Sequence, residues 1–215
     1  MSANETMTDD ISRTGDGQRK VIVSEFLSLD GVMQAPGGSD EDREGGFEHG
    51  GWQMQYFDEV YGDTVSEGIF TSDALLLGRK TYEIFAAYWP TATDEEVSGG
   101  FANLMNSIDK YVASRTLDTV EWQNSTLFKG DVAEAVARLK EQSGQDIRVI
   151  GSGELVQTLM EHDLVDEYQL MIHPLVLGGG KRLFKDGSKK NDLQLVDTKT
   201  TGTGVAILHY QTERE

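Results

Sequence analysis

The chain has 215 residues, no cysteine and a formal net charge of −18, from 37 Asp and Glu against 19 Lys and Arg. The missing cysteine excludes disulfides, thiol catalysis and zinc–thiolate sites, and the negative field disfavours nucleic acid and anionic membranes as partners. No apolar run approaches the ~20 residues of a membrane span, so we expect one cytoplasmic domain with a sizeable core.

The N-terminal part of the chain divides into a tail, a strand and a loop. Residues 1–18 contain no apolar stretch, so they are no secretory signal, and we expect a disordered tail ahead of one domain over 19–215. The β-branched apolar run VIVSEFLSL predicts a first strand over 21–29. The glycine-rich, charged segment 30–51 reads as a long loop, and such loops are either functional or disordered.

The middle of the chain alternates between helical and strand patterns. The spacing of Trp52 and Tyr56 predicts a helix over 52–70, and SDALLLG predicts a buried strand over 72–78. The helix after that strand should stop at Pro90. We further expect helices over 101–108, 131–144 and 154–164, strands over 109–117, 125–129 and 165–180, a strand and glycine turn over 146–153, and a hairpin over 193–212.

This order of elements predicts the fold class. Strands that alternate with helices indicate an α/β fold with a central, mostly parallel sheet and helices on both faces. The terminal hairpin adds an antiparallel edge, which mixed sheets of this class often carry.

Two junctions between a strand and a helix, LLLG-RKTYE (75–83) and RVIG-SGELV (148–156), have the composition of phosphate sites. In each, an apolar strand ends at a glycine and a helix follows at once. A helix N-terminus offers unpaired N–H groups and a partial positive charge to a phosphate. Arg79 and Lys80 add charge at the first junction. Either junction alone is equally consistent with a turn that only joins two elements.

A third feature lies at the end of the strand expected over 109–117, where Ser114 and Arg115 follow YVA. An arginine there could bind a ribose 2′-phosphate through two parallel hydrogen bonds. An exposed loop arginine with no ligand is the alternative.

The blocks VIVSEFLSLDG, SDALLLGRKTYE, DKYVASRTL and IRVIGSGELVQTLMEHDLVDEYQLMIHPLVLGGGKRLF occur in this order over about residues 20–211. In this order they resemble the dihydrofolate reductase-like superfamily. The nearest branch is the C-terminal reductase domain of the bifunctional riboflavin-biosynthesis deaminase-reductase. SLDG, LLLGRKTYE and LGGGKRLF carry most of the resemblance. These 215 residues contain no deaminase domain with zinc ligands, so we do not expect the bifunctional enzyme.

The resemblance implies a three-layer reductase that uses NADPH to reduce a pterin-, flavin-precursor- or pyrimidine-like heterocycle. It places residues of this chain in four groups. These are Gly78, Arg79, Lys80 and Thr81 at the cofactor phosphates, Ser114 and Arg115 at the 2′-phosphate, Gly151, Ser152, Gly153, Glu154 and Leu155 at the pyrophosphate, and Phe26, Asp30, Gly31, Val32, Met33 and Trp52 near the nicotinamide and substrate.

Asp58 is the candidate catalytic acid. Dihydrofolate reductases carry a carboxylate on the first helix, shortly after a tryptophan, and here Trp52 precedes Asp58 by six residues. A carboxylate in a half-dry pocket can have a raised pKa suited to proton delivery. The alternative is a solvated acid on an amphipathic helix.

Two partner classes and a rival function complete the expectations. The partners are a small heterocyclic substrate and a second copy of the chain, which would form a homodimer through the apolar C-terminal strands. The four histidines lack metal-ligand spacing, so no metal is expected. The rival function is a non-catalytic dinucleotide-binding module, a sensor or scaffold that keeps both glycine junctions.

The charge of −18 has two explanations, a salt-adapted host and ordinary solubility. In a salt-adapted protein, rising KCl should raise the unfolding temperature, because salt screens the repulsion between acidic groups. Circular dichroism melts in a KCl series measure this temperature. A transition that stays level or falls would exclude salt adaptation.

Overall fold

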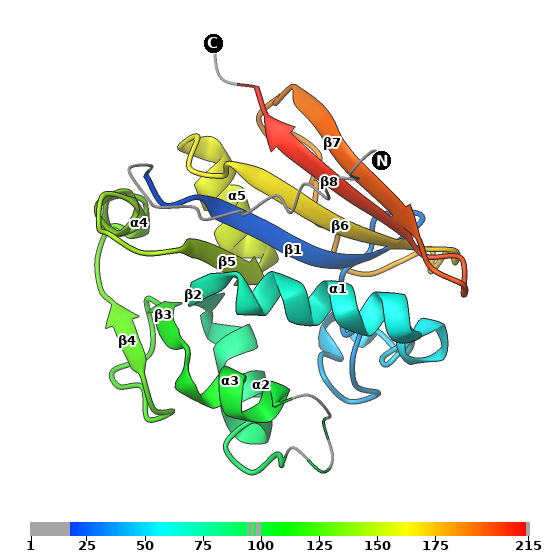
Figure 1. Cartoon of the computed structure of the whole chain (residues 1–215), viewed down its shortest axis with the longest axis horizontal. Helices are drawn as coiled ribbons and strands as arrows, with labels where there is room; N and C mark the ends of the chain where they lie inside the picture. The colour runs from blue at the N-terminus through cyan, green and yellow to red at the C-terminus, as the bar shows by residue number, and fades with distance from the viewer. Residues whose placement is uncertain (1–17, 94, 96, 98–99, 214–215) are drawn as a thin grey trace, which may run out of the picture.

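The computed structural model describes residues 18–93, 95, 97 and 100–213. Within these ranges eight strands form one sheet in the order β4-β3-β2-β5-β1-β6-β8-β7 (Figure 1). The tail expected over 1–18 lies outside the described residues except for Gln18, so its disorder stays a prediction.

The elements follow the expected alternation. The strands are β1 (Val21–Ser28), β2 (Ser72–Gly78), β3 (Asp109–Ala113), β4 (Ser125–Phe128), β5 (Asp146–Ile150), β6 (Glu167–His173), β7 (Leu193–Thr200) and β8 (Ala206–Thr212). The helices are α1 (Glu59–Phe70), α2 (Arg79–Tyr88), α3 (Phe101–Ser107), α4 (Val132–Lys140) and α5 (Gly153–Glu161), with short 3-10 turns η1 (Glu44–Gly46) and η2 (Met54–Tyr56). None of the helices in the described ranges has the length and apolar character needed to cross a bilayer.

The sheet confirms the predicted fold class. β1 to β6 run parallel to one another, whereas β8 pairs antiparallel with both β6 and β7. The predicted hairpin over 193–212 is therefore the antiparallel edge.

Helices cover both faces of the sheet, as expected. Leu139 of α4 and Leu159 of α5 pack in the core on one face, and Ile69 of α1 and Met105 of α3 pack in the core on the other. Burial of these apolar faces, at about 25 cal/mol per Å² of apolar surface, is the main stabilising contribution in a fold of this kind.

The helix predicted over 52–70 begins later than expected. Asp58 is its N-cap, with an extended φ of −140°, and its side chain accepts a hydrogen bond from Tyr61 N. A capped start stabilises a helix by about 1 kcal/mol. Trp52 instead lies buried in a turn, where its Nε1 donates to Gln34 O at 2.8 Å.

Three other elements are shorter than predicted. The strand predicted over 165–180 ends at His173, because Pro174 has no N–H to continue the ladder. The strand predicted over 109–117 ends at Ala113. The helix predicted over 131–144 ends at Lys140, and the Asp131 side chain caps its start.

The candidate site lies at the edge of the sheet where the parallel strands end. The carboxyl ends of parallel strands meet at the same edge, which gathers the residues that follow β1, β2, β3, β5 and β6. Strand order reverses between β2 and β5, and α2 and α5 leave these strands toward opposite faces. Ligands of open α/β sheets bind in the crevice at such a switch point.

Candidate functional site

Hydrogen bonds tie the two glycine junctions together. Gly78 N, at the end of β2, donates to Ser152 Oγ at 2.8 Å. The same hydroxyl lies 3.0 Å from Thr81 Oγ1 and 2.9 Å from Ile150 O. Thr81 Oγ1 in turn donates to Gly151 O at 2.9 Å. The starts of α2 and α5 are therefore side by side at the switch point.

These two helix starts differ from the other long helices in their caps. α1 and α4 are capped by the carboxylates of Asp58 and Asp131. α2 begins after Gly78 and α5 after Ser152, and neither receives a side-chain cap. Their first N–H groups and the positive ends of both helix dipoles thus lie side by side at the switch point, which suits an anion.

Close backbone approach at the second junction requires glycine. Gly151 has a φ of +62°, and a Cβ there would lie 3.2 Å from Thr81 Cγ2. A Cβ on Gly153 would lie 2.8 Å from Met33 Sδ. Met33, from the loop after β1, therefore lies against the start of α5.

Asp30 fastens the loop after β1 to the loop after β6. Its carboxylate accepts hydrogen bonds from Leu177 N at 3.0 Å, Gly178 N at 2.9 Å and the Ser28 hydroxyl at 2.7 Å. Burial raises the pKa of Asp30, but these hydrogen bonds outweigh burial and lower it to about 2. The Asp30 carboxylate therefore holds the two loops together.

A buried carboxylate lies beneath the second junction. Glu25 on β1 is 3% exposed, and its Oε1 has no hydrogen-bond partner among the described residues. Burial raises the pKa of Glu25 to about 8, and hydrogen bonds from the backbone of Gly151 and Ser152 offset part of this effect. The carboxyl group is therefore largely protonated at neutral pH.

An aromatic cluster around His173 lies at the end of β6. Its Nδ1 is 3.0 Å from Met171 O and 3.1 Å from Leu27 O, so Nδ1 carries the hydrogen. Nε2 is buried without a hydrogen-bond partner among the described residues. The rings of Phe26, Trp52, Tyr56 and Tyr61 lie edge-on or tilted at centroid distances from 4.9 to 6.2 Å.

The chemistry of His173 follows from this burial. Burial lowers its pKa, although the two carbonyl contacts offset part of the effect. A neutral imidazole with Nδ1 donating offers only the Nε2 lone pair to a ligand. His173 is fully buried, so this lone pair lies inside the aromatic cluster and not at an open surface.

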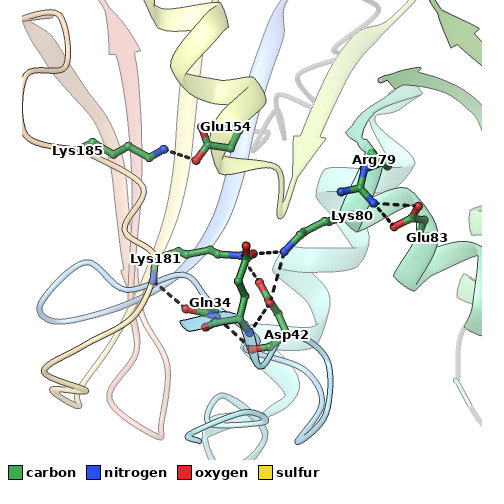
Figure 2. A network of polar contacts seen from close by, with 9 residues as sticks. Gln34, Asp42, Arg79, Lys80, Glu83, Glu154, Lys181 and Lys185 are labelled. Carbon is green, nitrogen blue, oxygen red and sulfur yellow. Dashed lines mark hydrogen bonds and ion pairs between the residues drawn. The ribbon is translucent and has the colours of Figure 1, made fainter. Parts of the chain in front are cut away.

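The basic residues of the candidate site differ in their partners. Arg79 pairs with Glu83 one turn along α2, at 2.9 Å. Lys80 contacts Glu44, and Lys185 pairs with Glu154 (Figure 2). Arg115 is exposed at the end of β3, beside β2, and makes no ion pair with the described part of the chain. Ser114 Oγ accepts from Leu117 N at 2.9 Å and shapes that turn.

Asp58 and Val32 lie in structural positions. Besides its cap, the Asp58 carboxylate accepts from Thr203 N at 3.3 Å, in the turn between β7 and β8. Val32 is fully buried, and its N–H donates to Ser28 Oγ. The structure thus brings Gly78, Thr81, Gly151, Ser152, Gly153 and Met33 together, places Phe26 and Trp52 around His173, and leaves Asp58 at the α1 start.

A groove of about 500 Å³ lies between α2 and the segment before β4. Glu83 and Glu121 are the charged residues in its lining, so it does not suit a phosphate. Within the described ranges, no group of three or more His, Asp or Glu side chains could hold a metal ion.

Sequence reasoning missed two residues beside the crevice. Glu25 interrupts the inward series Val21, Val23 and Leu27 of β1, and this period of two was a usable signal. Lys181 gave no such signal, because its partners lie in a distant loop.

Comparison with known proteins identifies a matching family and similar proteins. The family model of the RibD C-terminal domain matches residues 19–207. The uncharacterized protein YyaP of Bacillus subtilis (strain 168) is 32% identical over 194 residues, which cover 90% of this chain and 95% of YyaP. The uncharacterized protein YwjB of the same strain is 30% identical over 196 residues, covering 90% and 98%.

Two solved structures share the fold. A proposed riboflavin biosynthesis protein from Shewanella sp. PV-4 superposes with a TM-score of 0.68 at 22% identity, over 91% of this chain and 99% of that chain. A pyrimidine reductase-like protein from Corynebacterium diphtheriae gives 0.59 at 13% identity, over 92% and 93%.

Replacing Ser152 by Ala should destabilise the protein, because Gly78 N would lose its acceptor in the buried junction. We expect a loss of about 1–3 kcal/mol in the free energy of unfolding, measured by urea denaturation. Ser125→Ala is the matched control, since the Ser125 hydroxyl is buried without a partner in the described structure. It should change stability by less than about 0.5 kcal/mol. Equal losses in both variants would contradict the joining role of Ser152.

Replacing Glu25 by Gln should change how stability depends on pH. The folded pKa of about 8 exceeds the ordinary 4.5. The contribution of protonated Glu25 to the free energy of unfolding is therefore complete below pH 4.5 and is lost as pH rises through 8. Relative to Glu25→Gln, the wild type should lose on the order of 3 kcal/mol between pH 5 and 9 in urea denaturation.

Glu167→Gln provides the comparison of opposite sign. Glu167 is also buried, but its hydrogen bonds with Lys20 and His209 outweigh burial and lower its pKa. Its ionised form therefore contributes stability above pH 4.5, and the Gln variant should be less stable than wild type at pH 7. Parallel pH profiles for wild type and Glu25→Gln would refute the raised pKa of Glu25.

Proposed function

Because the chain belongs to the RibD C-terminal domain family, we propose that it is an NADPH-dependent reductase of a pyrimidine-like heterocycle. A pterin or a flavin precursor is a substrate of the same chemical kind. NADPH, when bound, would supply the hydride, and the protein would bind and orient both rings.

One observation carries the proposal, namely the pair of uncapped helix starts that Ser152 holds side by side. A dinucleotide carries two linked phosphates, and two neighbouring N-termini offer N–H groups for both. The contact of Met33 with Gly153 supports a cofactor that continues from this crevice toward the loop after β1.

Arg115 supports NADPH over NADH. It follows β3, the neighbour of β2, at the carboxyl edge of the sheet and makes no ion pair in the described structure. In a chain of net charge −18, an arginine without a carboxylate partner is a position that favours the additional 2′-phosphate.

The aromatic cluster around His173 supports a planar substrate. Phe26 lies on β1 next to β6, and its ring stacks on Tyr61 at 5.6 Å. Asp58 stays the predicted proton donor, although its carboxylate already accepts two backbone hydrogen bonds.

Replacing Arg79 and Arg115 together by Ala should weaken NADPH binding by at least about tenfold more than NADH binding, because NADH lacks the 2′-phosphate. Fluorescence titration with each nucleotide measures both affinities. The control Lys190→Ala/Lys199→Ala removes the same charge near and on β7, at the opposite side of the sheet. Equal losses for NADPH and NADH would show that neither arginine recognises the phosphate.

Turnover tests the reductase itself. With NADPH, absorbance at 340 nm should fall in the presence of a ribosylamino-pyrimidine or dihydrofolate, and Asp58→Asn should slow this reaction by about 100-fold if the acid delivers the proton. Nucleotide binding without turnover on either heterocycle would favour a non-catalytic binding module. No binding of either nucleotide would refute both functions.

A further inference from the structure

Two lysines from distant parts of the chain share one carboxylate oxygen next to the start of α2. Lys80 is the second residue of α2, and Lys181 lies in the loop between β6 and β7. Glu44 Oε2 contacts both ammonium groups, at 2.6 Å from Lys181 Nζ. Asp42 completes the group, with Oδ2 at 2.6 Å from Lys181 Nζ and Oδ1 at 3.8 Å from Lys80 Nζ (Figure 2).

Asp42 and Glu44 belong to a segment that crosses this corner of the molecule, residues 37–46, which we call the acidic strap. The strap is braced from within, because Glu41 accepts hydrogen bonds from the backbone of Gly37 and Gly38. Gln34 Nε2 also donates to Glu44 O at 2.9 Å. The side-chain contacts of the strap with α2 and the 181 loop are the ion pairs of Asp42 and Glu44.

The ion pairs of Glu44 are open to solvent, whereas the side chain of Asp42 is only 17% exposed. The side chain of Glu44 is 59% exposed, and those of Lys80 and Lys181 are 47% and 41% exposed. Exposed pairs contribute little to stability and are screened by salt. A ligand that offers the lysines a stronger anion can therefore replace the Glu44 carboxylate at small cost, and it must also compete with the less exposed Asp42 carboxylate.

We propose that Lys80 and Lys181 form a subsite for a ligand phosphate, which the carboxylates of Asp42 and Glu44 occupy until the ligand displaces the acidic strap. The proposal rests on the proposed function for the neighbouring dinucleotide crevice. An oxygen bound by two ammonium groups is a position that a phosphate oxygen can take. A phosphate monoester carries more charge than a carboxylate and three acceptor oxygens, and the uncapped N-terminus of α2 lies beside the two lysines.

The exchange does not depend on protonation. Hydrogen bonds from Lys181 and Lys80 lower the pKa of Glu44 to about 2. For Asp42, burial raises the pKa, but the Lys181 contact outweighs it and lowers the value. Both carboxylates stay ionised at neutral pH, so phosphate displaces them by competition alone.

Inorganic pyrophosphate is the probe, titrated into the full chain by isothermal calorimetry. Lys181→Met should weaken pyrophosphate binding at least tenfold, because one of two cations is lost. Asp42→Asn/Glu44→Gln should strengthen it about fivefold, because the internal competitor is gone. The controls Lys189→Met and Glu134→Gln/Asp192→Asn change charge equally at exposed sites away from the strap and should stay within about twofold of wild type.

Trypsin reports the strap directly, since it cleaves after the exposed Arg43 at its centre. Pyrophosphate should accelerate this cleavage in wild type, and Asp42→Asn/Glu44→Gln should be cleaved rapidly without pyrophosphate. A Lys181→Met variant that binds pyrophosphate like wild type would overturn the proposal. So would cleavage that is unchanged at saturation, or the absence of pyrophosphate binding in both wild type and the double variant. Pyrophosphate binding with strap release but without NADPH binding would instead refute the proposed function alone.

Discussion

The hydroxyl of Ser152, in the turn after β5, accepts a hydrogen bond from Gly78 N at the end of β2. This bond joins the two halves of the candidate site. These two strands are neighbours, but their helices leave toward opposite faces of the sheet. The bond from Gly78 N to Ser152 Oγ extends the pairing of β2 with β5, which reaches Leu76 and Val149, to the starts of the two helices. With it, α2 and α5 present their first N–H groups to one crevice, and Gly151 lets Thr81 close the other side.

The sequence was informative where the deciding interactions are local. Buried strands that end at glycine predicted both junctions, and the alternation of elements predicted the sheet and its antiparallel edge. The helical spacing of Trp52 and Tyr56 was misleading, because their burial comes from a turn and an aromatic cluster. The Asp58 cap, a local signal that competed with that spacing, decides where α1 begins.

Long-range pairing lies beyond such patterns. Nothing in LGGGKRLF shows that Lys181 meets Glu44 and Asp42, since this contact depends on how two loops cross. The hydrogen bonds that Asp30 makes to the loop after β6 depend on the same crossing. Glu25 lies between these two cases. The sequence shows its inward position on β1, but its contact with the turn of Gly151 and Ser152 depends on the pairing of β5 with β1.

A strap tethered at both ends also sets a threshold for ligands. Its carboxylates face Lys80 and Lys181 at an effective concentration of about millimolar or more, because they belong to the same chain. A simple anion that makes one contact must exceed this internal concentration to enter. A dinucleotide that binds the two helix starts at the same time brings multivalency of its own. The strap would thus exclude common small anions from the crevice and admit ligands that engage several points at once.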